Sequence, residues 1–162
     1  MNEVLTHIST YLCISYHQSP MLSQKARYAI KALVYLAQQP EGEPVRTMDI
    51  SEKNNLPKKF LEIILLDLKR EGLVGSKMGS HGGYYLQKNA TDINLAEIYR
   101  LFDGAIALVP CASEKFFEPC EDCQDLACCP LRISMMQVRK QTFQALESIS
   151  IASMLTQGSG PC

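Results

Sequence analysis

Residues 47–86 read TMDISEKNNLPKKFLEIILLDLKREGLVGSKMGSHGGYYL, and most of the fold prediction rests on them. Thr47 is a residue type that caps helices, so a short helix is expected from there to about Lys53. Asn54-Asn55 makes a turn, and Pro57 stands where the first turn of a second helix tolerates proline. That helix is expected to end at Glu71, before Gly72, with one apolar face made of Phe60, Leu61, Ile64, Leu65 and Leu68. Two short helices joined by a tight turn predict a helix-turn-helix.

The residues that follow predict a wing. Residues 73–77 and 84–87 have the pattern of two strands around the glycine-rich turn 79–83. We therefore predict a mainly α fold with a small β wing, a winged helix-turn-helix that carries a long C-terminal helix. The candidate DNA contacts are Thr47, Pro57, Lys58, Lys59, Glu62, Lys77, Ser80 and His81. Two alternatives stay open: Lys58 and Lys59 as ordinary solvated residues, and His81 as a plain turn residue.

Outside this stretch the chain divides into further segments. Residues 1–20 form an N-terminal extension, expected to be a loose arm or a misassigned start, and Ser23 begins a first helix that extends to about Gln39. The winged-helix domain is expected over 21–104, with a helix from Leu95 to Phe102. A cysteine-rich sensor loop over 105–130, a dimerisation helix over 131–156 and a flexible tail over 157–162 complete the chain.

The last helix carries a narrow apolar seam. Its members alternate by four and three residues: Leu131, Met135, Val138, Thr142, Ala145, Ile149 and Ala152. This spacing favours a partner helix, most simply the same helix of a second copy, and so a homodimer. Packing within one chain is the alternative.

Charge is segregated along the chain although the net charge is only −1. Residues 53–88 hold seven Lys or Arg against three acidic residues, whereas residues 111–129 hold five acidic residues against one lysine. DNA would be attracted to the first segment and repelled by the second. The two segments are therefore predicted to have different roles.

The acidic segment contains five cysteines. A set of four possible ligands consists of Cys111, Cys120 and Cys123 together with either Cys128 or Cys129. With Cys129 as the fourth, the spacing is C-x8-C-x2-C-x5-C. Four thiolates can hold an iron-sulfur cluster, either [2Fe-2S] or [4Fe-4S], or a tetrahedral zinc ion. A metal-free thiol switch and inert cysteines are the alternatives.

Several protein classes do not fit the sequence. No apolar run approaches the roughly 20 residues of a membrane span, and the first twenty residues lack the features of a secretory signal. We expect a cytoplasmic protein that does not associate with membranes, and its cysteines are expected to be reduced. No catalytic triad, phosphate loop or paired carboxylates stand at recognisable spacing, so no enzyme is predicted.

The order of these parts resembles the IscR/NsrR/CymR family of winged-helix regulators. The similar stretches are LSQKARYAIKALVYLA, TMDISEKNNLPKKFLEIILLDLKREGLV, the wing GSHGGYYL and LAEIYRLFDG, and the resemblance covers about residues 21–156. It implies a homodimer, a palindromic operator and, in many members, a cluster bound at the sensor loop. The family spacing favours Cys129 over Cys128 as the fourth ligand.

The sequence departs from that family at the fourth ligand. Some relatives use a histidine after the third cysteine, but no histidine follows His81 here; others use an acidic residue in the first helix, where this chain has Arg27. The predicted function is a DNA-binding transcriptional regulator whose operator binding is modulated by a cluster that senses iron-sulfur, redox or nitric oxide status. Its rivals are a metal-free or zinc-dependent regulator and an iron-sulfur or zinc carrier that does not bind DNA.

Overall fold

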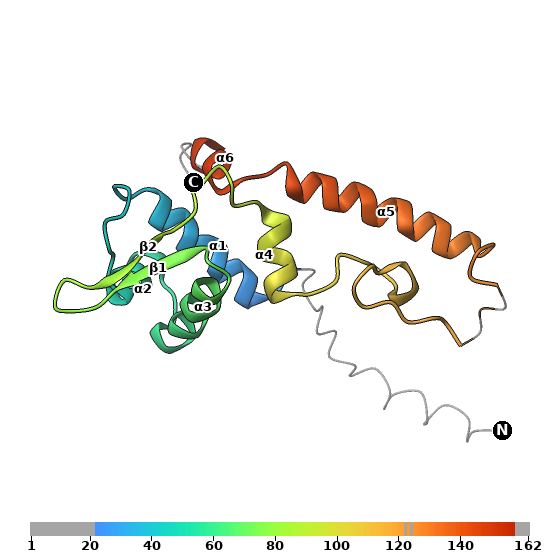
Figure 1. The fold of residues 1–162 in the computed structure, drawn as a ribbon, viewed down its shortest axis with the longest axis horizontal. Helices are drawn as coiled ribbons and strands as arrows, with labels where there is room; N and C mark the ends of the chain where they lie inside the picture. The colour runs from blue at the N-terminus through green and yellow to red at the C-terminus, as the bar shows by residue number, and fades with distance from the viewer. Residues whose placement is uncertain (1–21, 122, 124, 158–162) are drawn as a thin grey trace, which may run out of the picture.

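The computed structural model describes residues 22–121, 123 and 125–157. A globular part contains most of the elements, and one long helix projects from it with the cysteine loop alongside (Figure 1). The elements are α1 (Gln24–Ala37), α2 (Thr47–Asn54), α3 (Lys58–Arg70), β1 (Val74–Lys77), β2 (Gly83–Leu86), α4 (Leu95–Phe102), the 3-10 turn η1 (Pro110–Ala112), α5 (Pro130–Glu147) and α6 (Ile151–Gln157). The predicted fold class, mainly α with a small β wing, is confirmed.

The core lies between α1, α3 and the elements that cover them. The apolar face predicted for the second helix is buried at Leu61, Ile64, Leu65 and Leu68, each with no exposed surface. Leu33 of α1 is equally buried among them. Burial of each such side chain contributes roughly 1.5–3 kcal/mol, so the spacing of these residues explains why α3 packs on this face.

The wing is an antiparallel hairpin that is held against the start of α2. Val74 pairs with Leu86 and Lys77 with Gly83. Val45 forms an isolated antiparallel bridge with the second strand, since its N–H and its carbonyl each hydrogen-bond to the backbone of Tyr84 at 2.8 Å. A Cβ on Gly83 would overlap the carbonyl oxygen of Val45, so this close approach requires glycine. The wing and α2 are therefore one unit.

The prediction of one continuous helix over 131–156 is wrong, because this segment forms two helices, α5 and α6. α5 ends at Glu147, and Ile149 and Ala152 of the predicted seam lie beyond it. The chain instead bonds to the segment before α4: Leu95 N–H donates to Ile149 O at 3.0 Å, and Ile151 N–H donates to Ile93 O at 2.9 Å. Ile151 is fully buried in the core, and this burial directs α6 back onto α1.

Two smaller differences concern the chain ends and a cap. Thr47 was expected to cap α2, but it is the first helical residue; Arg46 stands at the cap position, and its guanidinium pairs with Asp49. The N-terminal extension 1–20 and residues 158–162 of the tail lie outside the described residues. The remaining domain boundaries stay predictions.

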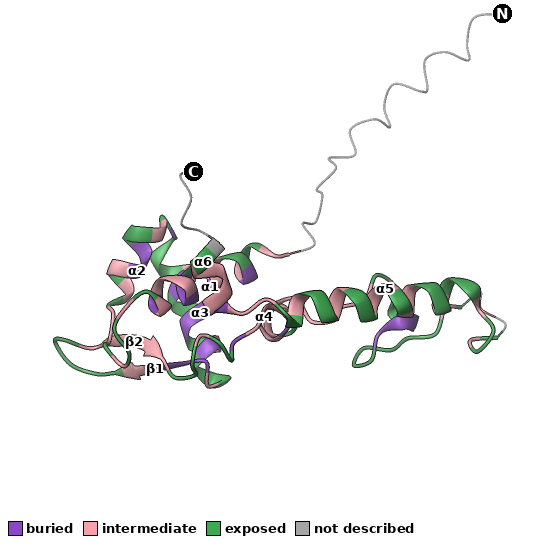
Figure 2. Ribbon diagram, turned by 90° about the horizontal axis from the view of Figure 1, so that it is seen from above, coloured by how far each residue is buried: buried purple, intermediate pink, exposed green. Residues whose placement is uncertain are grey.

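Burial separates the globular part from the projecting helix. Figure 2 shows buried residues gathered in the globular part, with one further buried segment beside α5, and this segment is η1. None of the 18 residues of α5 is buried. Within the described residues, none of the helices combines the length and the apolar character that crossing a membrane requires.

Candidate DNA interface and cysteine centre

The turn between α2 and α3 is fixed by local contacts. Asn55 adopts a left-handed conformation with φ of 50°, which asparagine tolerates better than most residues. The buried Ser51 hydroxyl donates to the carbonyl of Leu56 at 2.6 Å. Leu56 is itself buried. These contacts set the angle at which α3 leaves the turn.

The predicted DNA contacts at this turn are exposed. Pro57 is the N-cap residue of α3, and Lys58 and Lys59 occupy its first turn with their side chains in solvent. Glu62 is exposed one turn further on, whereas Thr47 at the start of α2 is half-buried. The N-terminal end of a recognition helix is the part that reaches base edges and phosphates, so the two lysines are accessible there, and their contact with DNA stays a prediction.

The wing residues fall into two groups. Ser80 and His81 are exposed at the tip, with the Ser80 hydroxyl 3.1 Å from Nδ1 of His81. Lys77, in contrast, already donates to the carbonyl of Gly42 at 2.9 Å, and its ammonium lies 5.4 Å from the centre of the Tyr85 ring. Lys77 therefore also braces the wing against the loop before α2.

Two of the predicted ligands, Cys123 and Cys129, are in contact in the cysteine loop, and Cys111 lies near enough to Cys123 to affect it. The thiols of Cys123 and Cys129 are hydrogen-bonded to each other. Partial burial, followed by that hydrogen bond and by the charges of Cys129 and Cys111, raises the pKa of Cys123. Cys111 is buried, and the N–H of Cys123 donates to the carbonyl of Cys120 at 3.3 Å.

Cys128 and Cys129 face different partners. The backbone N–H of Arg132 donates to Cys129 and is the main reason why the pKa of that thiol is lowered. Cys128 is exposed and bonds to the Asp125 carboxylate, whose pKa is lowered first by the N–H of Ala127 and then by Cys128. The structure thus places Cys129, and not Cys128, beside Cys123.

The donor set fits a metal centre in kind. Sulfur donors from one loop suit an iron-sulfur cluster or zinc. Within the described residues, however, no group of three His, Cys, Asp or Glu side chains is close enough to hold a metal ion. The sulfurs would have to close around the group as it binds.

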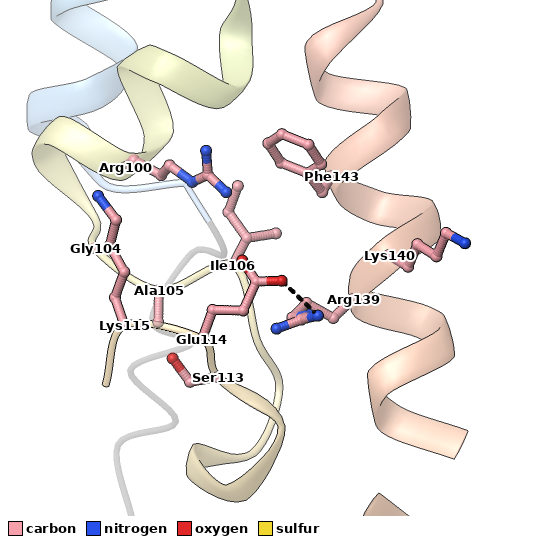
Figure 3. A pocket seen from close by; sticks show the side chains of 10 residues that line it. All are labelled: Arg100, Gly104, Ala105, Ile106, Ser113, Glu114, Lys115, Arg139, Lys140 and Phe143. Atoms are coloured by element: carbon pink, nitrogen blue, oxygen red, sulfur yellow. Dashed lines mark ion pairs between the residues drawn. The ribbon is translucent and has the colours of Figure 1, made fainter. Parts of the chain in front are cut away.

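An ion pair attaches the loop to α5, and a stacking contact joins α5 to α4 beside it. Arg139 of α5 pairs with Glu114 at 2.8 Å, and the guanidinium of Arg100 of α4 lies 4.3 Å from the centre of the Phe143 ring. Figure 3 shows these side chains around a cavity of about 110 Å³, with Lys140 directed away from it. The loop, α4 and α5 therefore meet at one place.

Comparison with known proteins identifies the family. A family model described as "Rrf2: Iron-dependent Transcriptional regulator" matches residues 22–157. The chain belongs to the Rrf2 family. Like the relatives described below, it is a transcriptional regulator that binds DNA, and it is not an enzyme.

Several relatives support this assignment. A putative HTH-type transcriptional regulator, rrf2-like, of Rhodobacter capsulatus is 38% identical over 141 residues, which cover 85% of this chain and 94% of that protein. IscR of Escherichia coli O1:K1 / APEC is 36% identical over 90 residues, 56% of each protein. Among solved structures, CymR, described as the global cysteine regulator of B. subtilis, has a TM-score of 0.69 at 28% identity and covers 85% of this chain and 98% of its own. The IscR structure of T. potens has a TM-score of 0.66 at 27% identity, covering 85% and 88%.

Within this Rrf2 chain, two groups of functional candidates were not found from sequence. Arg46 lies exposed at the start of α2, close to the wing, but an arginine before a threonine carries no distinctive signal. Arg132 and Arg139 contact the cysteine loop from α5, and only their spacing of seven residues on one helix face could have indicated it. Arg27, at the place where some relatives carry an acidic ligand, is exposed.

Proposed function

We propose that this Rrf2 protein binds a palindromic operator as a homodimer, and that an iron-sulfur cluster held by Cys111, Cys120, Cys123 and Cys129 modulates its affinity for DNA. The observation that carries the proposal is the contact between Cys123 and Cys129, with Cys111 near enough to influence Cys123. The iron dependence in the family description agrees with it. Because its target is chromosomal DNA, we place the protein in the cytoplasm.

The homodimer is supported by the exposed state of α5. Leu131, the first residue of the seam, is 56% exposed, and no seam residue within α5 is buried; an exposed apolar seam of this kind favours a partner. Two copies would present two α3 helices to half-sites roughly 34 Å apart. A cluster would supply iron charge that offsets the thiolates and would hold the loop closed against α5.

DNA binding is tested through its salt dependence. Replacing both Lys58 and Lys59 by Ala removes four lysines from a dimer, so the log-log salt slope should fall by up to about 3.6, at roughly 0.9 for each phosphate contact. Lys140→Ala, on α5, should leave the slope unchanged. If the wild type prefers no genomic fragment over random DNA, the operator proposal is wrong.

The cluster is tested by anaerobic reconstitution followed by absorption spectroscopy. Serine at 111, 120, 123 or 129 should abolish or destabilise the iron-sulfur absorption, because a hydroxyl is a harder and far less acidic ligand than a thiol. Cys128→Ser is the matched control and should keep the colour. Protein that binds only zinc, or no metal, would overturn the cluster proposal.

A second candidate is a metal-free thiol switch, favoured by the hydrogen bond between Cys123 and Cys129. Hydrogen peroxide would oxidise the Cys129 thiolate to a sulfenic acid as its O–O bond breaks and hydroxide leaves. The Cys123 thiol would then attack the sulfenic sulfur and displace water to form a disulfide. Mass spectrometry of peroxide-treated apoprotein distinguishes the two candidates. Because the Rrf2 family consists of transcriptional regulators, a carrier that does not bind DNA has no support.

A further inference from the structure

Arg132 contacts both ends of the cysteine loop from the first turn of α5. Its Nε donates to the carbonyl of Cys111 at 2.9 Å, and its Nη1 donates to the carbonyl of Leu126 at 3.3 Å. Its guanidinium also lies 5.9 Å from the centre of the Phe117 ring. One side chain thus contacts Cys111, near the beginning of the cysteine segment, and Leu126, near its end.

The chemistry of the guanidinium suits this place. A planar fork of N–H donors can satisfy two carbonyl oxygens at once, which the single ammonium of lysine does less well. The loop itself is acidic, with five carboxylates against one lysine over residues 111–129. Thiolates that gather here add further negative charge, so a fixed cation beside Cys129 lowers the cost of bringing them together.

Other contacts do not duplicate this role. Arg139 reaches the loop two turns further along α5, but it pairs with the exposed carboxylate of Glu114, whereas Arg132 holds the backbone on which Cys111 lies. Lys140 is exposed, and Figure 3 shows it directed away from the loop. Cys111, whose carbonyl Arg132 holds, is 2% exposed.

We propose that Arg132 is the positioning residue of the cysteine centre: its guanidinium holds the two ends of the loop together and supplies positive charge to the assembled thiolates. The charge part of this inference rests on the proposed cluster. The positioning part does not, since the contacts are those of the metal-free chain.

The first measurement uses metal-free, full-length protein. Arg132→Met removes the charge and both hydrogen bonds, Arg132→Lys keeps the charge, and Lys140→Met is the matched control on the same helix. Alkylation of Cys111 by iodoacetamide, followed by mass spectrometry, should be about tenfold faster or more in Arg132→Met, because two charge-assisted hydrogen bonds are lost. Lys140→Met should label at the wild-type rate.

The second measurement uses protein reconstituted with iron and sulfide under anaerobic conditions. Arg132→Met should lose its visible absorption faster in air and should have a lower reduction potential, since a nearby positive charge favours the reduced cluster. Arg132→Lys should have the reduction potential of the wild type, because it keeps the charge. Its Cys111 should still be alkylated fast, because the two hydrogen bonds are lost, so this variant separates the effect of charge from that of hydrogen bonding. A merely structural role would not produce this split.

The outcomes are distinguishable. Wild-type labelling of Cys111 in Arg132→Met overturns the positioning role, and an unchanged potential overturns the charge role. If wild-type protein takes up no cluster, the proposed function fails, while the labelling result still decides the positioning role. Should Arg132→Met not fold, as judged by circular dichroism, the labelling of Arg132→Lys decides instead, and wild-type protection in that variant would refute the bidentate contact.

Discussion

Ile151 provides a direct test of the way α6 returns to the globular part. Its side chain has no exposed surface and packs in the core with Leu33, Ile93 and Ile98. Ile151→Ala removes three carbons from this site, and substitutions of this kind cost roughly 2–5 kcal/mol, because the cavity left behind collapses only in part. For a chain of this length each kcal/mol lowers the midpoint temperature by about 2–4 °C, so a decrease of roughly 4–20 °C is expected.

Equilibrium urea unfolding followed by circular dichroism measures the cost in free energy, and thermal unfolding followed in the same way measures the decrease in midpoint temperature. All variants are compared at one protein concentration, because the midpoint of a dimer depends on concentration. Ile63→Ala is the matched control, since Ile63 is 51% exposed on α3 and its truncation should cost about 1 kcal/mol or less. If the two variants unfold at the same urea concentration, Ile151 is not a core residue, and the predicted single helix over 131–156 would again be tenable.

Three further predictions follow from contacts elsewhere. Gly83→Ala places a Cβ against the carbonyl of Val45, so it should separate the wing from α2 at a cost of about 1–3 kcal/mol and weaken operator binding in a mobility-shift assay; an affinity equal to that of the wild type would contradict the wing geometry. In metal-free protein the pKa of Cys129 is lowered and that of Cys123 is raised, so Cys129 should form a thiolate at a lower pH than Cys123. Cys129 should therefore be alkylated at a lower pH, as measured by mass spectrometry. If the alkylation rates of the two thiols rise over the same pH range, the asymmetry is refuted. Ala145→Glu places a carboxylate on the α5 seam and should give a monomer in sedimentation, whereas Gln144→Glu beside it should not; a monomeric wild type at micromolar concentration removes the seam argument.

Local patterns explain why much of the globular part could be predicted. The face of α3 follows from the spacing of four buried residues, and α4 is capped by Asn94, whose side chain accepts from the N–H of Glu97. The wing follows from two short strands around glycines. In each case the signal lies within a few residues, where propensity and periodicity act.

Long-range contacts explain what could not be predicted. The end of α5 depends on pairing of residues 149–151 with residues 93–95, which the seam spacing does not reveal. Ser150 bonds to the N–H of Ser153 and so caps α6, but a serine within an apolar seam gave no clear stop. The contacts of Arg132 with the loop are likewise visible only in three dimensions. At the cysteine centre, the spacing identified the donors and the structure distinguished Cys128 from Cys129.

A series of side-chain contacts connects the cysteine loop to the recognition helix α3. Arg100 of α4 stacks on Phe143 of α5, at the place where Arg139 holds Glu114. At the same end of α4, its C-cap residue Asp103 accepts the N–H of Ser23 at 3.1 Å and so fixes the start of α1.

From α1, an ion pair reaches α3. Lys25 lies 5.2 Å from the centre of the Phe102 ring and pairs with Asp67 of α3 at 2.7 Å. Because packed elements move as units and deform little internally, we infer that these contacts can carry a displacement of the loop through α4 and α1 to α3. A cluster that closes the loop would therefore act on the angle of α3 within one chain, in addition to any change in the distance between the two subunits.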